Sequence, residues 1–298
     1  MTAAQSPAIP SQPVTPTATA GSAAAARVWR PDTPGKAIRQ ARLFDPASGR
    51  SVVVALDHAL DHGQIRGLDD MEKTLAAMMT EPPDGVIVRL STLKRYHHLL
   101  ARRDGPAIIA ALDSRMTASL PGGPTLGEEH RLVAGVEEAL ALGADAVKVL
   151  LIFGRKDLRV HADNLERVAR VIAAGDRWGV PVMVETVLWG LGVPEERRHD
   201  PEWVTHIARI GAELGADIIK APYAPGSFAQ LTRQLPVPVM ILGGGRMARE
   251  EDFYQTVSDA VAEGAAGVAI GRNVWQHPHP AQVVRRLKEI VYGRQAKG

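Results

Sequence analysis

Eight apolar runs rich in Val and Ile recur along the chain. They do not alternate strictly between apolar and polar residues, which is the pattern of strands that are covered on both faces. The runs span residues 51–57, 85–90, 107–113, 146–152, 180–186, 217–221, 237–242 and 266–270. This pattern predicts eight buried strands.

Stretches with helical periodicity follow most of these runs. They span residues 68–79, 128–142, 161–178, 201–214, 248–263 and 278–291. Gly143, Gly179, Gly215 and Gly264 fall just past helix ends, where a left-handed C-cap favours glycine. Alternating strands and helices predict an α/β fold with parallel strands. The count of eight favours one closed (β/α)8 TIM barrel over an open doubly wound sheet.

The first 26 residues differ from the rest of the chain. They are rich in Ala, Pro, Ser and Thr and contain no charged side chain. Several prolines interrupt them, and they lack the positive start and long apolar core of a signal peptide. We therefore expect a disordered tail over residues 1–26, followed by a single barrel domain over residues 27–298.

Composition narrows the function classes. The 298 residues are enough for one barrel, which typically uses about 250. The absence of cysteine excludes disulfides, thiolate nucleophiles and cysteine metal sites, and it fits a cytoplasmic protein. The net charge of +2 comes without a basic stripe, so no nucleic-acid partner is expected, and the pair Arg197 and Arg198 is interpreted as solvated charge. No apolar stretch reaches about 18 residues, so no membrane span is expected.

Active sites of TIM barrels lie at the carboxyl ends of the strands. Ionisable residues occupy or follow the ends of the first six predicted strands: Asp57, Arg89, Asp113, Lys148, Glu185 and Lys220. Burying an ammonium group is costly unless it is paired or neutralised, so lysines inside buried strands indicate function.

Lys220 is the sharpest candidate, because it lies at the end of its strand, before Ala221 and Pro222. A desolvated lysine beside another cation supplies the neutral amine that attacks a carbonyl and forms an iminium. Lys148 could be that second cation, since the four apolar residues after it place it deeper. The alternative for Lys220 is a side chain that extends to solvent at the barrel mouth. The alternative for Lys148 is an ion pair with Glu185 or Asp57 that only stabilises the fold.

Two carboxylates could move protons around such an iminium. Glu185 could act as a proton shuttle, and Asp57 could hold or deprotonate a substrate hydroxyl. Each also has a purely structural alternative. Glu185 could serve only as an ion-pair partner, and Asp57 could be a turn or capping carboxylate at the end of its strand. His58, Asp61 and His62 could instead suggest a metal site, but their spacing is not a zinc pattern. We expect neither a metal nor a cofactor.

Glycine-rich loops follow the last two predicted strands. Loops at these positions in TIM barrels commonly bind phosphate through backbone N–H groups, and an arginine adds a bidentate contact. The predicted phosphate ligands are Gly244, Gly245, Gly271 and Arg272. Tight turns without a ligand are the alternative.

Together these motifs resemble class I aldolases of the bacterial and archaeal fructose-bisphosphate and tagatose-bisphosphate aldolase superfamily. The resemblance spans about residues 37–292. It rests on residues 54–58 (VALDH), 217–220 (DIIK), 243–245 (GGG) and 271–275 (GRNVW). It implies that Lys220 is the iminium lysine and that Asp57 handles the substrate hydroxyl.

Two branches of this superfamily differ in their proton shuttle. One uses a Tyr on strand four or five, which is missing from residues 185–189 (ETVLW). The branch of tagatose-bisphosphate and sulfosugar-phosphate aldolases carries a Lys on strand four and a Glu on strand five. Lys148 and Glu185 are similar to that pair.

The resemblance implies a metal-independent aldolase that acts on a small phosphorylated ketose and releases dihydroxyacetone phosphate or a relative. It also implies a homo-oligomer, because relatives usually assemble into rings. Two other hypotheses remain open. One is a Schiff-base transaldolase or thiolase-like acyl transferase, and the other is a non-catalytic barrel that binds a sugar phosphate.

Overall fold

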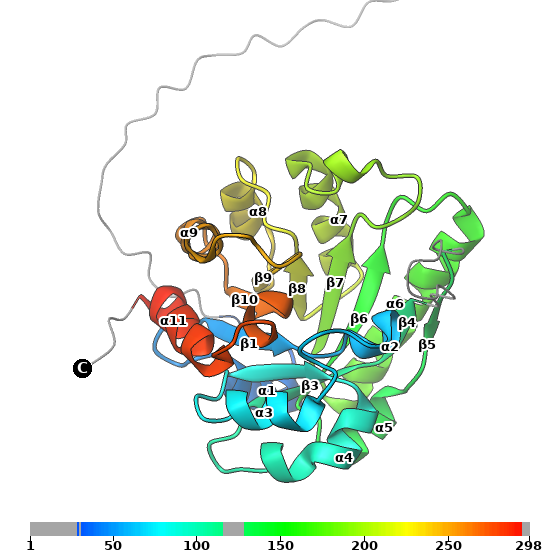
Figure 1. Ribbon diagram of the computed structural model, residues 1–298. Coiled ribbons are helices and arrows are strands. Elements are labelled where there is room, and N and C mark those ends of the chain that lie inside the picture. Colours follow the sequence, from blue (N-terminus) through cyan, green and yellow to red (C-terminus); the bar gives the residue numbers. More distant parts are fainter. Residues whose placement is uncertain (1–28, 30, 116–127, 294–298) are drawn as a thin grey trace, which may run out of the picture.

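A closed barrel of eight parallel strands forms the centre of the computed structural model, which describes Trp29 and residues 31–115 and 128–293 (Figure 1). The strands follow each other around the barrel in the order β1-β10-β9-β8-β7-β6-β3-β2. They are β1 (Ser51–Ala55), β2 (Gly85–Val88), β3 (Ala107–Ala111), β6 (Ala146–Ile152), β7 (Val182–Val187), β8 (Ile218–Ala221), β9 (Val239–Leu242) and β10 (Gly267–Ile270). This TIM barrel confirms the predicted fold and excludes the open sheet, while the predicted tail over residues 1–26 lies outside the described residues.

Both faces of the strands are buried, as the unbroken apolar runs predicted. Successive side chains point to opposite faces, so alternate residues fall into two separate clusters. On β1, for example, Val52 and Val54 pack toward the helices, whereas Val53 and Ala55 fill the barrel interior. The inside of the barrel is therefore a packed core below the mouth.

Helices surround the barrel and bury their apolar faces against the strands (Figure 1). The longer ones are α3 (Met71–Met78), α4 (Leu90–Leu100), α5 (Val136–Ala141), α6 (Leu158–Trp178), α7 (Pro201–Glu213), α8 (Phe228–Gln234), α9 (Glu250–Ala262) and α11 (Pro280–Tyr292). Short turns of helix lie at α2 (Ala59–His62), η1 (Glu195–Arg197) and α10 (Arg272–Trp275). Gly143, Gly179, Gly215 and Gly264 all have positive φ angles, which confirms the expected caps.

Helix α1 (Pro34–Leu43) lies at the amino-terminal ends of the strands, opposite the mouth. Leu43 joins the inner core, and Lys36 is almost fully buried. The Lys36 ammonium lies 2.9 Å from an oxygen of Asp217 and also pairs with Asp176. An apolar side chain and a neutralised cation thus attach α1 to the barrel.

The helix predicted over residues 128–142 is wrong in its first half. Residues of β5 (His130–Leu132) pair antiparallel with β4 (Asp113–Arg115), and only α5 is helical. Three of the longer described helices, α1, α4 and α8, were not expected from the periodicity. Helix α4 begins inside the run that the pattern assigns to a strand, and α8 has only 7 residues.

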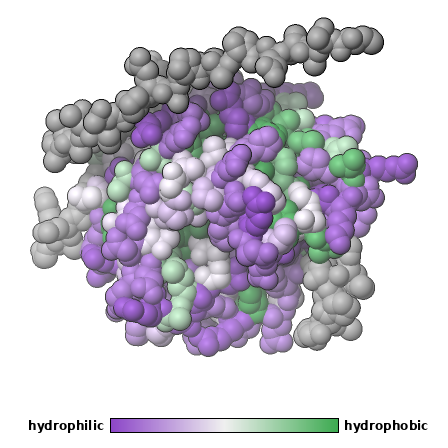
Figure 2. Space-filling view, turned by 90° about the horizontal axis from the view of Figure 1, so that it is seen from above, coloured by the Kyte–Doolittle hydropathy of each residue, from purple (hydrophilic) through white to green (hydrophobic). Residues whose placement is uncertain are grey.

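The molecular surface seen from above in Figure 2 is mostly hydrophilic, with apolar residues in scattered patches. The exposed large apolar side chains include Ile38, Leu60, Val133 and Leu158. None of the described helices is long and apolar enough to cross a membrane.

Candidate functional site

Four ionisable side chains meet inside the barrel near the mouth. Lys148 Nζ lies 3.1 Å from Asp57 Oδ2 and 2.9 Å from Glu185 Oε2. Lys220 Nζ lies 3.0 Å from the same oxygen of Glu185. Each of the four residues is at most 6% exposed. The structure thus brings together all four residues that the sequence singled out for catalysis, in one cluster of two cations and two anions.

Strand periodicity explains why these side chains converge. Met183 and Ile218 fill the barrel core, so Glu185 and Lys220, each two residues further along, also point inward. Glu185 and Lys220 are paired in the register of β7 and β8. Lys148 is paired with Met183, so its backbone lies one inward layer deeper, as the four apolar residues after it suggested.

The charges in this cluster stabilise one another. Burial by itself would raise the pKa of Asp57, but Lys148 and the other nearby cations outweigh it and hold that pKa well below its usual range. Burial would likewise raise the pKa of Glu185, yet Lys148 and Lys220 bring it below the ordinary value. Burial disfavours the charged form of Lys148, but Asp57 and Glu185 outweigh this and raise its pKa. Both carboxylates are therefore ionised and Lys148 is a cation at neutral pH.

A cavity of about 600 Å³ opens above the cluster. Asp57, Lys148, Glu185 and Lys220 all contribute to its wall. Its size is in the usual range for a small-molecule site, and its charged wall matches the clusters found at catalytic centres.

The glycine-rich loop after β9 forms another part of the same wall. Gly244 and Gly245 line the cavity, and a β-carbon added to either would meet open space. Gly244 has a φ of 58°, which favours glycine. The backbone of this loop is therefore bare toward the cavity.

The loop after β10 contributes Arg272, which also lines the cavity. Its Nε is buried and makes no hydrogen bond with a described residue. Asn273 ties the two loops together by donating to the carbonyl oxygens of Gly243 and Gly245 at 3.1 Å each. Gly271 does not line the cavity. A β-carbon there would lie 2.7 Å from His58, so packing also requires its missing side chain.

Arg89 and Asp113 brace the strand ends and do not line this cavity. Arg89 Nε donates to the backbone oxygen of Asp57 at 3.0 Å, and its NH1 donates to the backbone oxygen of Asp113. The Asp113 carboxylate accepts from the amide of Leu150 at 2.6 Å and lies 2.9 Å from His130 Nε2. Their bonds fix the carboxyl ends of β1, β3 and β6 relative to one another.

The histidines of the first loop lie beside the cluster. His58 packs edge-on against Trp275, with ring centroids 5.5 Å apart. Burial, partly opposed by Asp57, lowers the pKa of His58 to about 4, so its ring is neutral at neutral pH. Within residues 31–115 and 128–293, no three His, Asp or Glu side chains are arranged to hold a metal ion.

Sequence reasoning missed part of the cavity wall. Arg115, Trp189, Arg198 and His199 also line it, and the Arg115 guanidinium stacks over the Trp189 ring at 5.1 Å. Arg198, interpreted from the sequence as solvated charge, is half-buried and lines this open cavity. Only Trp189 carried a local signal, since it lies two residues beyond the end of β7.

Comparison with known proteins adds a family to this geometry. Residues 51–277 match the DeoC/LacD family aldolase. The chain is 32% identical to 2-amino-3,7-dideoxy-D-threo-hept-6-ulosonate synthase 1 of Archaeoglobus fulgidus, over 87% of this chain and 92% of the relative. It is 27% identical to the 3-hydroxy-5-phosphonooxypentane-2,4-dione thiolase of Enterobacter sp., over 87% of this chain and 81% of the relative.

A solved structure is similar over its whole length. This archaeal fructose 1,6-bisphosphate aldolase superposes with a TM-score of 0.74 at 28% identity, covering 87% of this chain and 99% of the other. Relatives on this fold thus carry the names of an aldolase, a synthase and a thiolase.

Proposed function

Because the chain belongs to the DeoC/LacD family of aldolases, we propose that it is a class I aldolase. It forms or cleaves a carbon–carbon bond in a phosphorylated ketose through a Schiff base on Lys220. The observation that carries this proposal is the contact of Lys220 Nζ with Glu185 Oε2, at 3.0 Å, on the wall of the cavity. A buried amine next to an ionised carboxylate has a proton acceptor within reach.

Substrate binding begins with the phosphate. The bare loop at Gly244 and Gly245 and the Arg272 guanidinium hold it on one side of the cavity, whereas Gly271, which the sequence also predicted as a ligand, packs against His58 and keeps only the turn that carries Arg272. Arg272 suits this role because its buried Nε lacks a partner among the described residues. The carbonyl of the bound ketose is then presented to Lys220.

Cleavage of the carbon–carbon bond follows formation of an iminium on Lys220. Glu185 takes a proton from the Lys220 ammonium, and the free amine attacks the ketose carbonyl. Glu185 returns this proton to the carbinolamine hydroxyl, which leaves as water, and an iminium remains. Asp57 removes the proton from the hydroxyl on the far carbon of the breaking bond, and an aldehyde leaves. The electron pair of the broken bond moves to the iminium, which becomes an enamine.

Product release returns the site to its starting state. The proton on Asp57 passes in one concerted relay through the Lys148 ammonium to Glu185, which gives it to the enamine carbon. Water then hydrolyses the resulting iminium. Dihydroxyacetone phosphate or a relative departs, and Lys220 is free again. Lys148 stays protonated throughout and balances the charges of Asp57 and Glu185, which its contacts at 3.1 and 2.9 Å allow.

A related acyl or aldol transfer is the second candidate, and the relative named as a thiolase favours it. Transfer would require a second substrate, such as a thiol that accepts the acyl group. An assay that needs no acceptor would support the aldolase. A barrel that only binds sugar phosphates would tolerate loss of Lys220, which the next experiment tests.

Borohydride reduction followed by intact mass measurement tests the proposal. With dihydroxyacetone phosphate, the wild type and Lys148→Met should gain the mass of a reduced adduct, and Lys220→Met should not. Lys148→Met should react more slowly, because the cluster has lost a charge. A substrate-dependent adduct on Lys220→Met would contradict the assignment, and a peptide map that places it on Lys148 would reverse the two roles.

A further inference from the structure

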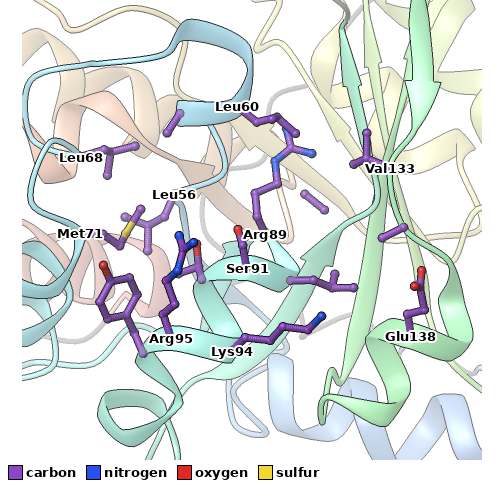
Figure 3. Close-up of a pocket in the computed structure, with 16 residues that line it drawn as sticks. Leu56, Leu60, Leu68, Met71, Arg89, Ser91, Lys94, Arg95, Val133 and Glu138 are labelled. Atoms are coloured by element: carbon purple, nitrogen blue, oxygen red, sulfur yellow. The ribbon is translucent and has the colours of Figure 1, made fainter.

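A second cavity, of about 540 Å³, lies against the loop after β1, α4 and the segment that leads into α5 (Figure 3). No described residue lines both this cavity and the one above Lys220. Its volume is in the range of small-molecule sites.

One side of this second cavity is apolar. Figure 3 shows Leu56, Leu68 and Met71 gathered on one side, with Val133 on the opposite side. Leu60 and Val133 at its edge are 54% and 50% exposed. Water in contact with these side chains would be released by an apolar ligand, which favours binding.

Positive charge is spread along the wall, because Figure 3 shows the Arg95 side chain beside Leu56 and Met71 and the Lys94 side chain pointing toward the side of Glu138. Arg89, Lys94, Arg95 and the carboxylate of Glu138 line the wall, and Arg89 pairs with Asp61 at 3.5 Å. Neither Lys94 nor Arg95 forms an ion pair with a described residue. Ser91 and the rest of the first turn of α4 also line the cavity, and this helix start has no side-chain cap. N–H groups at such a start carry partial positive charge.

We propose that this second cavity binds a small organic anion with an apolar body and one carboxylate or phosphate group. The apolar wall accommodates the body, Arg95 and Ser91 hold the anionic group, and Lys94 adds positive charge to the wall. An inorganic anion would leave the apolar wall in water, and an uncharged apolar molecule would leave both cations unpaired. Charge and apolar surface together therefore select an amphipathic anion.

Arg89 connects the second cavity with the barrel mouth. Arg89 is 7% exposed and lines the second cavity, while its Nε donates to the backbone oxygen of Asp57 at 3.0 Å. The ligand would lie against the guanidinium that positions the end of β1. The binding site itself does not depend on the proposed aldolase reaction.

Fluorescence titration with anilinonaphthalene sulfonate tests the proposal, because this dye has an apolar body and one anionic group. The full-length protein should bind one dye per chain. Lys94→Glu combined with Arg95→Glu should weaken binding at least about tenfold. The matched control combines Lys73→Glu with Arg103→Glu, which makes the same charge change at two exposed residues outside the cavity, and it should retain the affinity. Leu60→Ser, also at an exposed position, should weaken binding without any change of charge.

Competitors locate the dye and identify the anionic group. Phenylacetate or phenyl phosphate should displace it, and the better of the two indicates the preferred group. Displacement by dihydroxyacetone phosphate would place the dye in the barrel mouth and overturn the proposal. Displacement by inorganic phosphate alone would overturn the need for an apolar body. Equal weakening in the two charge-reversed proteins, or in neither, would also overturn it.

Discussion

Glu185 Oε2 lies 3.0 Å from Lys220 Nζ, and the two residues are directly paired in the register of β7 and β8. The same oxygen lies 2.9 Å from Lys148 Nζ. One carboxylate oxygen thus faces both buried ammonium groups. Proton transfer at Lys220 and charge balance at Lys148 are therefore coupled through Glu185.

Glu185→Gln should separate Schiff-base formation from turnover. Glutamine keeps the size of the side chain and removes the base, so turnover should fall by roughly 10²–10⁴-fold. Borohydride should still trap an adduct on Lys220, more slowly. Glu196→Gln, at an exposed position outside the cavity, is the control and should retain activity. Wild-type turnover in Glu185→Gln would assign the proton transfers to another group.

Lys148→Met should destabilise the protein in a pH-dependent way. Removing the cation leaves two buried carboxylates, of Asp57 and Glu185, with one remaining partner, which costs about 3–5 kcal/mol at pH 7. Without Lys148, burial raises the pKa values of both carboxyls, so protonation at lower pH relieves the cost. Urea unfolding should show a smaller difference from the wild type near pH 5 than near pH 7.

The free energy of unfolding of the wild type should decrease as the pH falls, whereas lower pH relieves the cost in Lys148→Met. The pKa values of Asp57 and Glu185 are lowered by folding, so their contribution is present above the ordinary carboxyl pKa of about 4 and is lost as the pH falls. A pH-independent difference between wild type and Lys148→Met would contradict this coupling.

Arg272→Ala should raise KM for a phosphorylated substrate roughly 10- to 150-fold, because a charge-assisted contact contributes about 1.5–3 kcal/mol. Steady-state kinetics with a substrate found by trapping measure this. Arg249→Ala removes an exposed arginine at the end of the loop after β9, outside the cavity, and should leave KM unchanged. An unchanged KM in Arg272→Ala would place the phosphate elsewhere.

Lys36→Met should weaken the attachment of α1. The ammonium pairs with Asp217, which is nearly buried, so its loss should lower the free energy of unfolding by about 3 kcal/mol. Burial opposes the charge of Lys36, but Asp176 and Asp217 outweigh it and raise its pKa. Its contribution is therefore full below the ordinary lysine pKa and disappears only at higher pH. Lys73→Met, at an exposed position, should change urea unfolding by less than about 0.5 kcal/mol.

Metal removal tests whether the iminium on Lys220, and not a metal ion, accepts the electron pair of the broken bond. An iminium on Lys220 needs no metal ion, so activity should survive excess chelator. Loss of activity on chelation, restored by zinc, would return His58 and His62 to consideration as ligands.

Local rules in the sequence determined the barrel and the inward direction of its charges. Apolar runs on buried strands, helical stretches and glycine caps depend on short-range geometry, so they can be read along the chain. The two-residue period of a strand makes Lys148, Glu185 and Lys220 share the inner face once one of their neighbours is known to be in the core. This is why all four proposed catalytic residues could be named from the sequence.

Only the tertiary structure decided which charges touch. The stagger between β6, β7 and β8 sets Lys148 one layer below Glu185, and no local pattern encodes that stagger. The same holds for Arg198, which lies in a polar stretch of the sequence and reaches the cavity only because of the path of its loop. It also holds for His130, which lies in a strand paired with β4 where the sequence predicted a helix. These contacts join residues far apart in sequence, and their geometry is defined only when the barrel closes.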